Sequence, residues 1–177
     1  IATWRANRPV LEGRAAYELT PERIHSTDPP RWVQADIKQE AYDGSRLSEV
    51  SLLDPDAVPR VADAFSVQPW VAIVSIRKRP THLSVFLEYR RPVGLVEYGD
   101  QLLLPIDGAG IVLDGSDFNP EAAEDFLRIT IPSPLIGSLV AGESWPDDRV
   151  VAAALIAQWV QARASDWGIA RIKHIPL

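Results

Sequence analysis

The side chains that most often carry catalysis or bind metals are few and scattered in this sequence. Its three histidines, His25, His82 and His174, lie far apart, and none has a neighbour at the spacing of a metal-ligand pair. Cysteine is absent, which excludes disulfides, thiolate metal sites and a cysteine nucleophile. Serine, histidine and aspartate are present, but a Gly-x-Ser-x-Gly nucleophile elbow is not. We therefore expect no metal site and no cofactor, and we assign no catalytic residue.

Two further clusters invite a chemical interpretation. The turn Asp107-Gly108-Ala109-Gly110 is rich in glycine, but it matches no phosphate-binding motif and precedes no predicted helix, so we interpret it as a strand-connecting turn. Carboxylates gather a little further on, where a concave site could pair them for acid–base work. A solvated acidic surface is the interpretation we favour. These carboxylates belong to Asp117, Glu121, Glu124 and Asp125.

Basic residues near a predicted hairpin are the strongest candidates for recognition. Charges at both ends of paired strands could hold an acidic segment of another protein or a carboxylate. The competing interpretation is that charges at edges and turns only block the addition of a further strand. The predicted partner-binding residues are Arg77, Lys78, Arg79, Glu88, Arg90 and Arg91.

These charges sit in a predicted β-α-β-β module over residues 31–92. Alternating apolar and polar residues in Trp32–Tyr42 predict a half-buried strand. Asp56–Gln68 is predicted to be a helix that Asp56 caps and Pro69 ends. Trp70–Lys78 and Leu83–Glu88 then alternate around a turn and predict a hairpin. Because both sides of Trp70–Lys78 are largely apolar, we expect this strand to be central or covered.

The remaining chain divides into a lead-in and a second domain. Residues 1–30 lack a clear pattern, and we expect a docked strap. Residues 93–177 predict a mainly antiparallel β domain of short strands with one C-terminal helix, so the fold class is α+β. That helix, at about residues 148–164, has acidic residues at its start. Its expected core stripe is Val151, Leu155, Trp159 and Ala162, flanked by Ile156 and Val160.

Composition narrows the functional classes. The 177 residues include 18 Lys and Arg against 24 Asp and Glu, so the net charge of −6 argues against nucleic-acid binding. The longest apolar run, residues 150–157, is far shorter than the about 20 residues that a membrane-spanning helix needs.

Methionine is absent, and the last predicted strand is barely complete. We therefore expect a fragment with sequence missing at both ends.

Several segments, taken in order, resemble FtsQ/DivIB cell-division proteins, which carry a POTRA domain followed by a β domain. Arg90, Pro92 and Val93 match the family's ERxPVA ending, whereas Tyr89 stands in place of Glu and Gly94 in place of Ala. The other matching segments are Pro69-Trp70-Val71, Ile76-Arg77-Lys78-Arg79-Pro80, Leu83-Ser84-Val85, Leu104-Pro105-Ile106-Asp107, Gly110-Ile111-Val112-Leu113, Ile131-Pro132 and Leu135-Ile136-Gly137.

The resemblance implies a non-enzymatic scaffold in the cell envelope, on the periplasmic side of the cytoplasmic membrane. It implies an N-terminal membrane anchor before Ile1 and partners among other membrane-anchored division proteins. The family's main partner-binding edge lies in strands beyond Leu177, so it is transferred to no residue of this chain. Two alternatives remain: a POTRA-type binding module of an outer-membrane assembly or secretion system, and an enzyme of unrecognised type.

Overall fold

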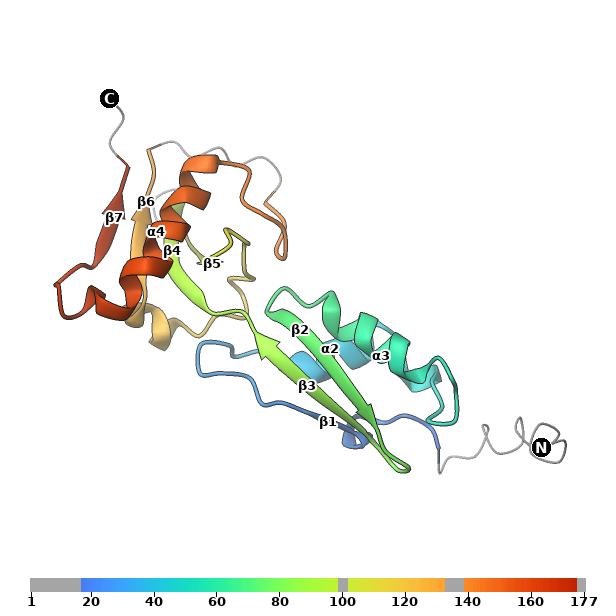
Figure 1. Ribbon diagram of the computed structural model, residues 1–177. Coiled ribbons are helices and arrows are strands. Elements are labelled where there is room, and N and C mark those ends of the chain that lie inside the picture. The colour runs from blue at the N-terminus through green and yellow to red at the C-terminus, as the bar shows by residue number, and fades with distance from the viewer. Residues whose placement is uncertain (1–16, 99–101, 133–138, 175–177) are drawn as a thin grey trace, which may run out of the picture. The chain divides into compact units, whose positions relative to one another are not determined.

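The computed structural model describes residues 17–98, 102–132 and 139–174. The chain forms two compact units (Figure 1). Unit 1 comprises Ile1–Pro29 and Asp36–Glu88, and unit 2 comprises Pro30–Ala35 and Tyr89–Leu177. The fold is mixed α/β, which agrees broadly with the expected α+β class, with one sheet in each unit and a C-terminal helix in the second.

Unit 1 is a three-stranded sheet with the order β1-β3-β2 and two helices on one face (Figure 1). Its strands are β1 (Ile24–Ser26), β2 (Val71–Lys78) and β3 (Leu83–Tyr89), and its helices are α2 (Ile37–Gly44) and α3 (Ala57–Ser66). Two short 3-10 turns, Pro21–Arg23 and Leu47–Glu49, complete it. The predicted helix and hairpin are therefore confirmed.

The helix-facing side of this sheet is apolar. Leu83, Val85 and Leu87 alternate along β3 and are buried, which is the period-2 pattern of a half-buried strand. Phe65 of α3 and Trp70 before β2 are fully buried as well. Packing of α3 against β2 thus forms the centre of this core.

Three predictions for this region are wrong. Residues 37–44 form helix α2, not part of a strand. The first strand is β1, which lies in the predicted strap and pairs in parallel with β3, Ile24 opposite Leu83. β2 is an edge strand and is not central, and the helices cover only one of its faces, since Ile73 is 53% exposed.

Unit 2 is a four-stranded sheet with the order β5-β4-β6-β7, and α4 packs across one face (Figure 1). The strands are β4 (Pro92–Tyr98), β5 (Leu102–Asp107), β6 (Leu127–Thr130) and β7 (Arg171–Lys173), the helix is α4 (Asp148–Ala164), and a 3-10 turn spans Pro120–Asp125. The sheet is mixed, because β4 pairs antiparallel with β5 while β4–β6 and β6–β7 are parallel. A mainly antiparallel domain is therefore the wrong description.

Close contact between β4 and β6 explains the glycine at position 94. A Cβ at Gly94 would lie 2.7 Å from Cδ1 of Ile129 and 3.1 Å from the carbonyl oxygen of Leu127. Alanine at this position would require Ile129 to move, so glycine fits the tight spacing.

Helix α4 turns a different face to the sheet from the one expected. Its buried residues are small, apart from Val150: Ala153, Ala154, Ala157 and Ala164. Leu155 is 46% exposed and Trp159 84% exposed, although both were expected in the core. Among the predicted strands, Ile111 and Val112 form only isolated bridges. The predicted turn at residues 99 and 100 and the matching segment 135–137 lie outside the described residues.

Candidate protein-binding sites

The six predicted partner-binding residues do not form one cluster. Arg77, Lys78 and Arg79 are exposed beside the β2–β3 hairpin turn in unit 1. Arg77 lies over the ring of Phe86 on the face that the helices leave open, 5.9 Å from its centroid. The Nζ atom of Lys78 donates to the carbonyl of Asp54 at 3.1 Å. The hairpin end of unit 1 is therefore a basic surface with one exposed aromatic ring.

At the opposite end of β3, Glu88 is exposed and is the last residue of unit 1. The two remaining residues of the prediction, Arg90 and Arg91, belong to unit 2. Glu88 and the hairpin arginines therefore lie at opposite ends of the β2–β3 hairpin.

Arg90 takes part in an internal ion pair. Its Nη1 atom donates to Oδ2 of Asp107 at 2.8 Å, and the Asp107 side chain is only 9% exposed. Oδ1 of the same carboxylate accepts from the backbone N–H groups of Ala109 and Ile111, both at 2.9 Å. Gly110 completes this turn with a φ of +80°, a conformation that favours glycine. The glycine-rich turn is thus a strand connection, closed by a buried carboxylate.

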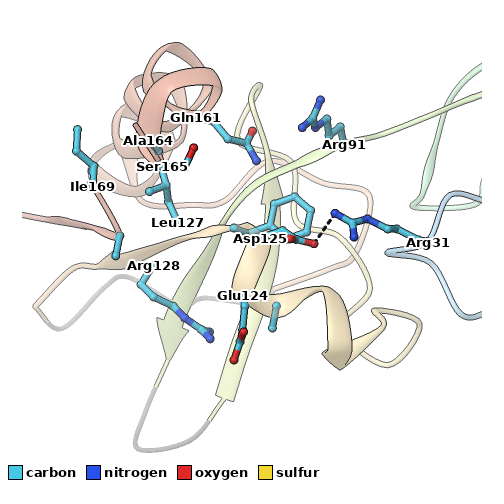
Figure 2. A pocket seen from close by; sticks show the side chains of 13 residues that line it. Arg31, Arg91, Glu124, Asp125, Leu127, Arg128, Gln161, Ala164, Ser165 and Ile169 are labelled. Carbon is cyan, nitrogen blue, oxygen red and sulfur yellow. Dashed lines mark ion pairs between the residues drawn. The ribbon is translucent and has the colours of Figure 1, made fainter. Parts of the chain in front are cut away.

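A pocket of about 630 Å³ in unit 2 brings together basic residues that lie far apart in the sequence (Figure 2). Arg31, Arg91 and Arg128 line it together with Glu124 and Asp125. Figure 2 shows Arg31 and Asp125 facing each other, and their ion pair measures 2.7 Å. The other lining residues come from the 3-10 turn and the start of β6, from the end of α4, and from the segment before β7.

The three arginines of this pocket are held in different ways. Arg91 lies over the ring of Trp32, 6.0 Å from its centroid, and the Trp32 indole donates to the carbonyl of Arg90 at 3.2 Å. Nη1 of Arg128 is buried and has no hydrogen-bond partner among the described residues. The pocket is therefore of mixed charge, with three guanidinium groups and two carboxylates in its lining.

The acidic residues are distributed much as the solvated interpretation expected. Glu121, Glu124 and Asp125 are exposed, and Asp117 is half-buried. Burial raises the pKa of Asp117, the nearby Asp114 charge adds to this increase, and the hydrogen bond from Ser116 opposes it. Asp117 does not line the arginine pocket. The described residues contain no group of three histidine, cysteine, aspartate or glutamate side chains placed to hold a metal ion.

A polar network crosses the sheet of unit 2. The Thr130 hydroxyl donates to Oε2 of Glu97, and Nη1 of Arg171 donates to the same oxygen and to Thr130. The bond from Thr130 lowers the pKa of Glu97 most, and Arg171 adds to the effect against the opposing influence of burial. Residues from β4, β6 and β7 meet here, so the network fastens the short edge strand β7.

Sequence reasoning missed contacts between residues that are distant in the chain. His25 and His82 stack with ring centroids 4.3 Å apart, because parallel pairing sets β1 beside the start of β3. Arg31 and Arg128 joined no predicted cluster, since the pocket is built from five separate segments. No local signal in the sequence indicates either arrangement.

The described residues thus form two mixed α/β units, and each unit exposes basic side chains. No protein-family model matches the chain. A search of curated proteins gives no match either. Among the described residues, no helix combines the length and the apolar character needed to cross a membrane.

Proposed function

We propose that this chain is a non-enzymatic scaffold of the FtsQ/DivIB type, which recruits other membrane-anchored division proteins on the periplasmic side of the cytoplasmic membrane. The observation that carries the proposal is the open edge and face of β2. This strand is eight residues long, and among the described residues it pairs only with β3. Long edge strands are usually shielded because they can pair with other chains.

The residues around that edge suit strand addition by a partner. Ile73 and Phe86 are each about half exposed, at 53% and 52%, and offer apolar contacts on the open face. Arg77 and Arg79 extend from the hairpin end. In strand addition, main-chain hydrogen bonds supply affinity and alternate side chains supply specificity. A partner strand with apolar residues and an acidic end therefore fits this surface.

The order of elements in unit 1 supports the POTRA-like part of the proposal. Its strand, two helices and hairpin place β3 between β1 and β2, which agrees with the resemblance carried by residues 69–94. Unit 2 follows with a mixed sheet and α4, where the resemblance expects the β domain.

Site-specific photo-crosslinking tests the proposal. A photoreactive amino acid at the exposed Ser75 of β2 is compared with one at the exposed Asp63 of α3, with the protein carried on a membrane anchor in dividing cells. We expect division proteins to crosslink at Ser75 and not at Asp63. Crosslinks to components of outer-membrane assembly or secretion would favour the alternative binding module. Equal or absent crosslinking at the two positions would contradict binding through β2.

A further inference from the structure

Helix α4 is apolar on both sides. One side packs on the sheet through Val150 and four alanines. The other side carries Leu155, Ile156 and Trp159, exposed by 46%, 53% and 84%. A helix that is apolar all round is normally covered all round, and an almost fully exposed tryptophan leaves a large apolar area in water. The outer side of α4 therefore has the character of a contact surface.

The outer side follows one row of residues along the whole helix. Asp148, Ala152, Leu155, Trp159 and Arg163 are all exposed, and their spacing of four, three, four and four residues keeps them on one face of an α-helix. Ile156 lies beside the centre of this row. We call these six residues the α4 outer face.

The order of side chains in this face is self-complementary. Asp148 lies seven residues before Leu155, and Arg163 lies seven residues after Ile156. Ala152 lies three residues before Leu155, and Trp159 three residues after Ile156. Consider two copies of α4 packed antiparallel, with a twofold axis between residues 155 and 156. Asp148 of each copy would then face Arg163 of the other, and Ala152 of each copy would face Trp159 of the other.

We propose that the α4 outer face binds a second copy of this chain, in an antiparallel helix pair with twofold symmetry. A twofold interface uses the same patch on both molecules, so that residue i meets residue j and j meets i. Here Asp148 pairs with Arg163 of the second copy, Trp159 packs over Ala152 of the second copy, and Leu155 meets Ile156 across the axis.

A groove beside Ala152 can receive the indole ring of the second copy. It has a volume of about 410 Å³ and is lined by Asp148, Ala152 and Ile156 of the outer face and by Ile172 and His174 at β7. Nδ1 of His174 is buried and has no hydrogen-bond partner among the described residues. Because this atom has no exposed surface, the groove receives the indole ring through its apolar lining.

Sedimentation velocity of the full 177-residue chain tests the interface. Since one helix face is small beside standard interfaces, we expect a monomer–dimer equilibrium that shifts toward dimer with rising concentration. Trp159→Glu should weaken association roughly tenfold or more, as for a central tryptophan anchor. Val67→Glu is the matched control, because Val67 is an apolar residue 73% exposed in unit 1. A chain that is monomeric at every concentration, or a dimer that Trp159→Glu leaves intact, would overturn the proposal.

Charge reversal distinguishes this geometry from any other apolar association. Asp148→Arg and Arg163→Asp, each alone, should weaken the dimer because two like-charged pairs then face each other. An equimolar mixture of the two variants should associate again, because every pair across the axis is then opposite in sign. Circular dichroism of each variant confirms that α4 is retained. Failure of the mixture to exceed the separate variants in dimer content would exclude the antiparallel register.

Discussion

The two units hold their charges in different places. In the described part of unit 1 every fully buried residue is apolar, and the charged side chains are exposed or half-buried. Unit 2 buries two carboxylates, Asp107 and Asp147. Asp107 closes a turn and pairs with Arg90, and Asp147 accepts from the backbone and side chain of Arg149 at the start of α4. The core of unit 1 is thus stabilised by the burial of apolar side chains. Unit 2 combines such a core with buried carboxylates that hydrogen-bond to its loops.

Truncation of Trp70 should have the largest effect, because it tests the apolar core of unit 1. The side chain is fully buried, and Trp70→Ala should lower the free energy of unfolding by about 3–5 kcal/mol. Trp159→Ala is the matched control and should cost at most about 0.5 kcal/mol in the monomer, because the side chain is exposed. Urea unfolding at low concentration measures both variants. Equal costs would contradict the core position of Trp70.

Removal of the Asp107 carboxylate should come next, because it tests the polar ties of unit 2. Asp107→Ala leaves two backbone N–H groups and the Arg90 guanidinium without their acceptor, which should cost about 1–3 kcal/mol. Asp107→Asn keeps one oxygen acceptor and should cost less. Urea unfolding again gives the values. If the two variants cost the same, the carboxylate does not act through these bonds.

Local pattern predicted the elements that short-range spacing determines. Helix α3, the β2–β3 hairpin and the bounds of α4 were all predicted, since apolar periodicity and helix-stop residues are local features. The segment 37–44 was misassigned because Val33, Ala35 and Ile37 alternate, whereas the structure uses Asp36 as an N-cap. Its side chain accepts from the backbone N–H of Gln39 at 3.0 Å, and Ile37 and Ala41 are buried one turn apart.

Long-range contacts determined the parts that could not be predicted. β1 has only three residues, and its parallel pairing with β3 crosses almost sixty positions of the chain. The stripe expected on α4 included Leu155 and Trp159, but the sheet accommodates alanines and leaves Trp159 outside. Arg90 was predicted to bind a partner, and only the structure shows its pairing with Asp107, 17 residues away. The hairpin arginines are exposed, as recognition residues need to be, and their role remains a prediction.

Acidification should loosen β7, a smaller effect that is confined to unit 2. Because the pKa of Glu97 is lowered in the folded state, its contribution to stability is present above the unfolded pKa and is lost as the pH falls through the folded pKa. The backbone N–H of His174 donates to the carbonyl of Thr130 at 3.1 Å, so its protection factor against hydrogen exchange should fall over that range. Glu97→Gln should show lower protection at neutral pH and little dependence on acid. An identical pH profile in the variant would contradict the role of this network.

Reversal of the hairpin charges should have the smallest effect on stability and separates folding from recognition. Arg77 and Arg79 are exposed, and the contact of Arg77 with Phe86 contributes about 0.5–1 kcal/mol at such a site. The double variant Arg77→Glu with Arg79→Glu should therefore unfold within about 1 kcal/mol of the original chain. Its recovery of partners from envelope extracts should nevertheless fall, because an acidic partner segment would meet like charges. The double variant Lys38→Glu with Arg60→Glu, on α2 and α3, changes the net charge by the same amount. It is the matched control, and its recovery of partners should stay constant. If the double variant recovers the same proteins in the same amounts, the hairpin end is not a recognition surface, and its charges serve only to keep the open edge of β2 from pairing with other chains.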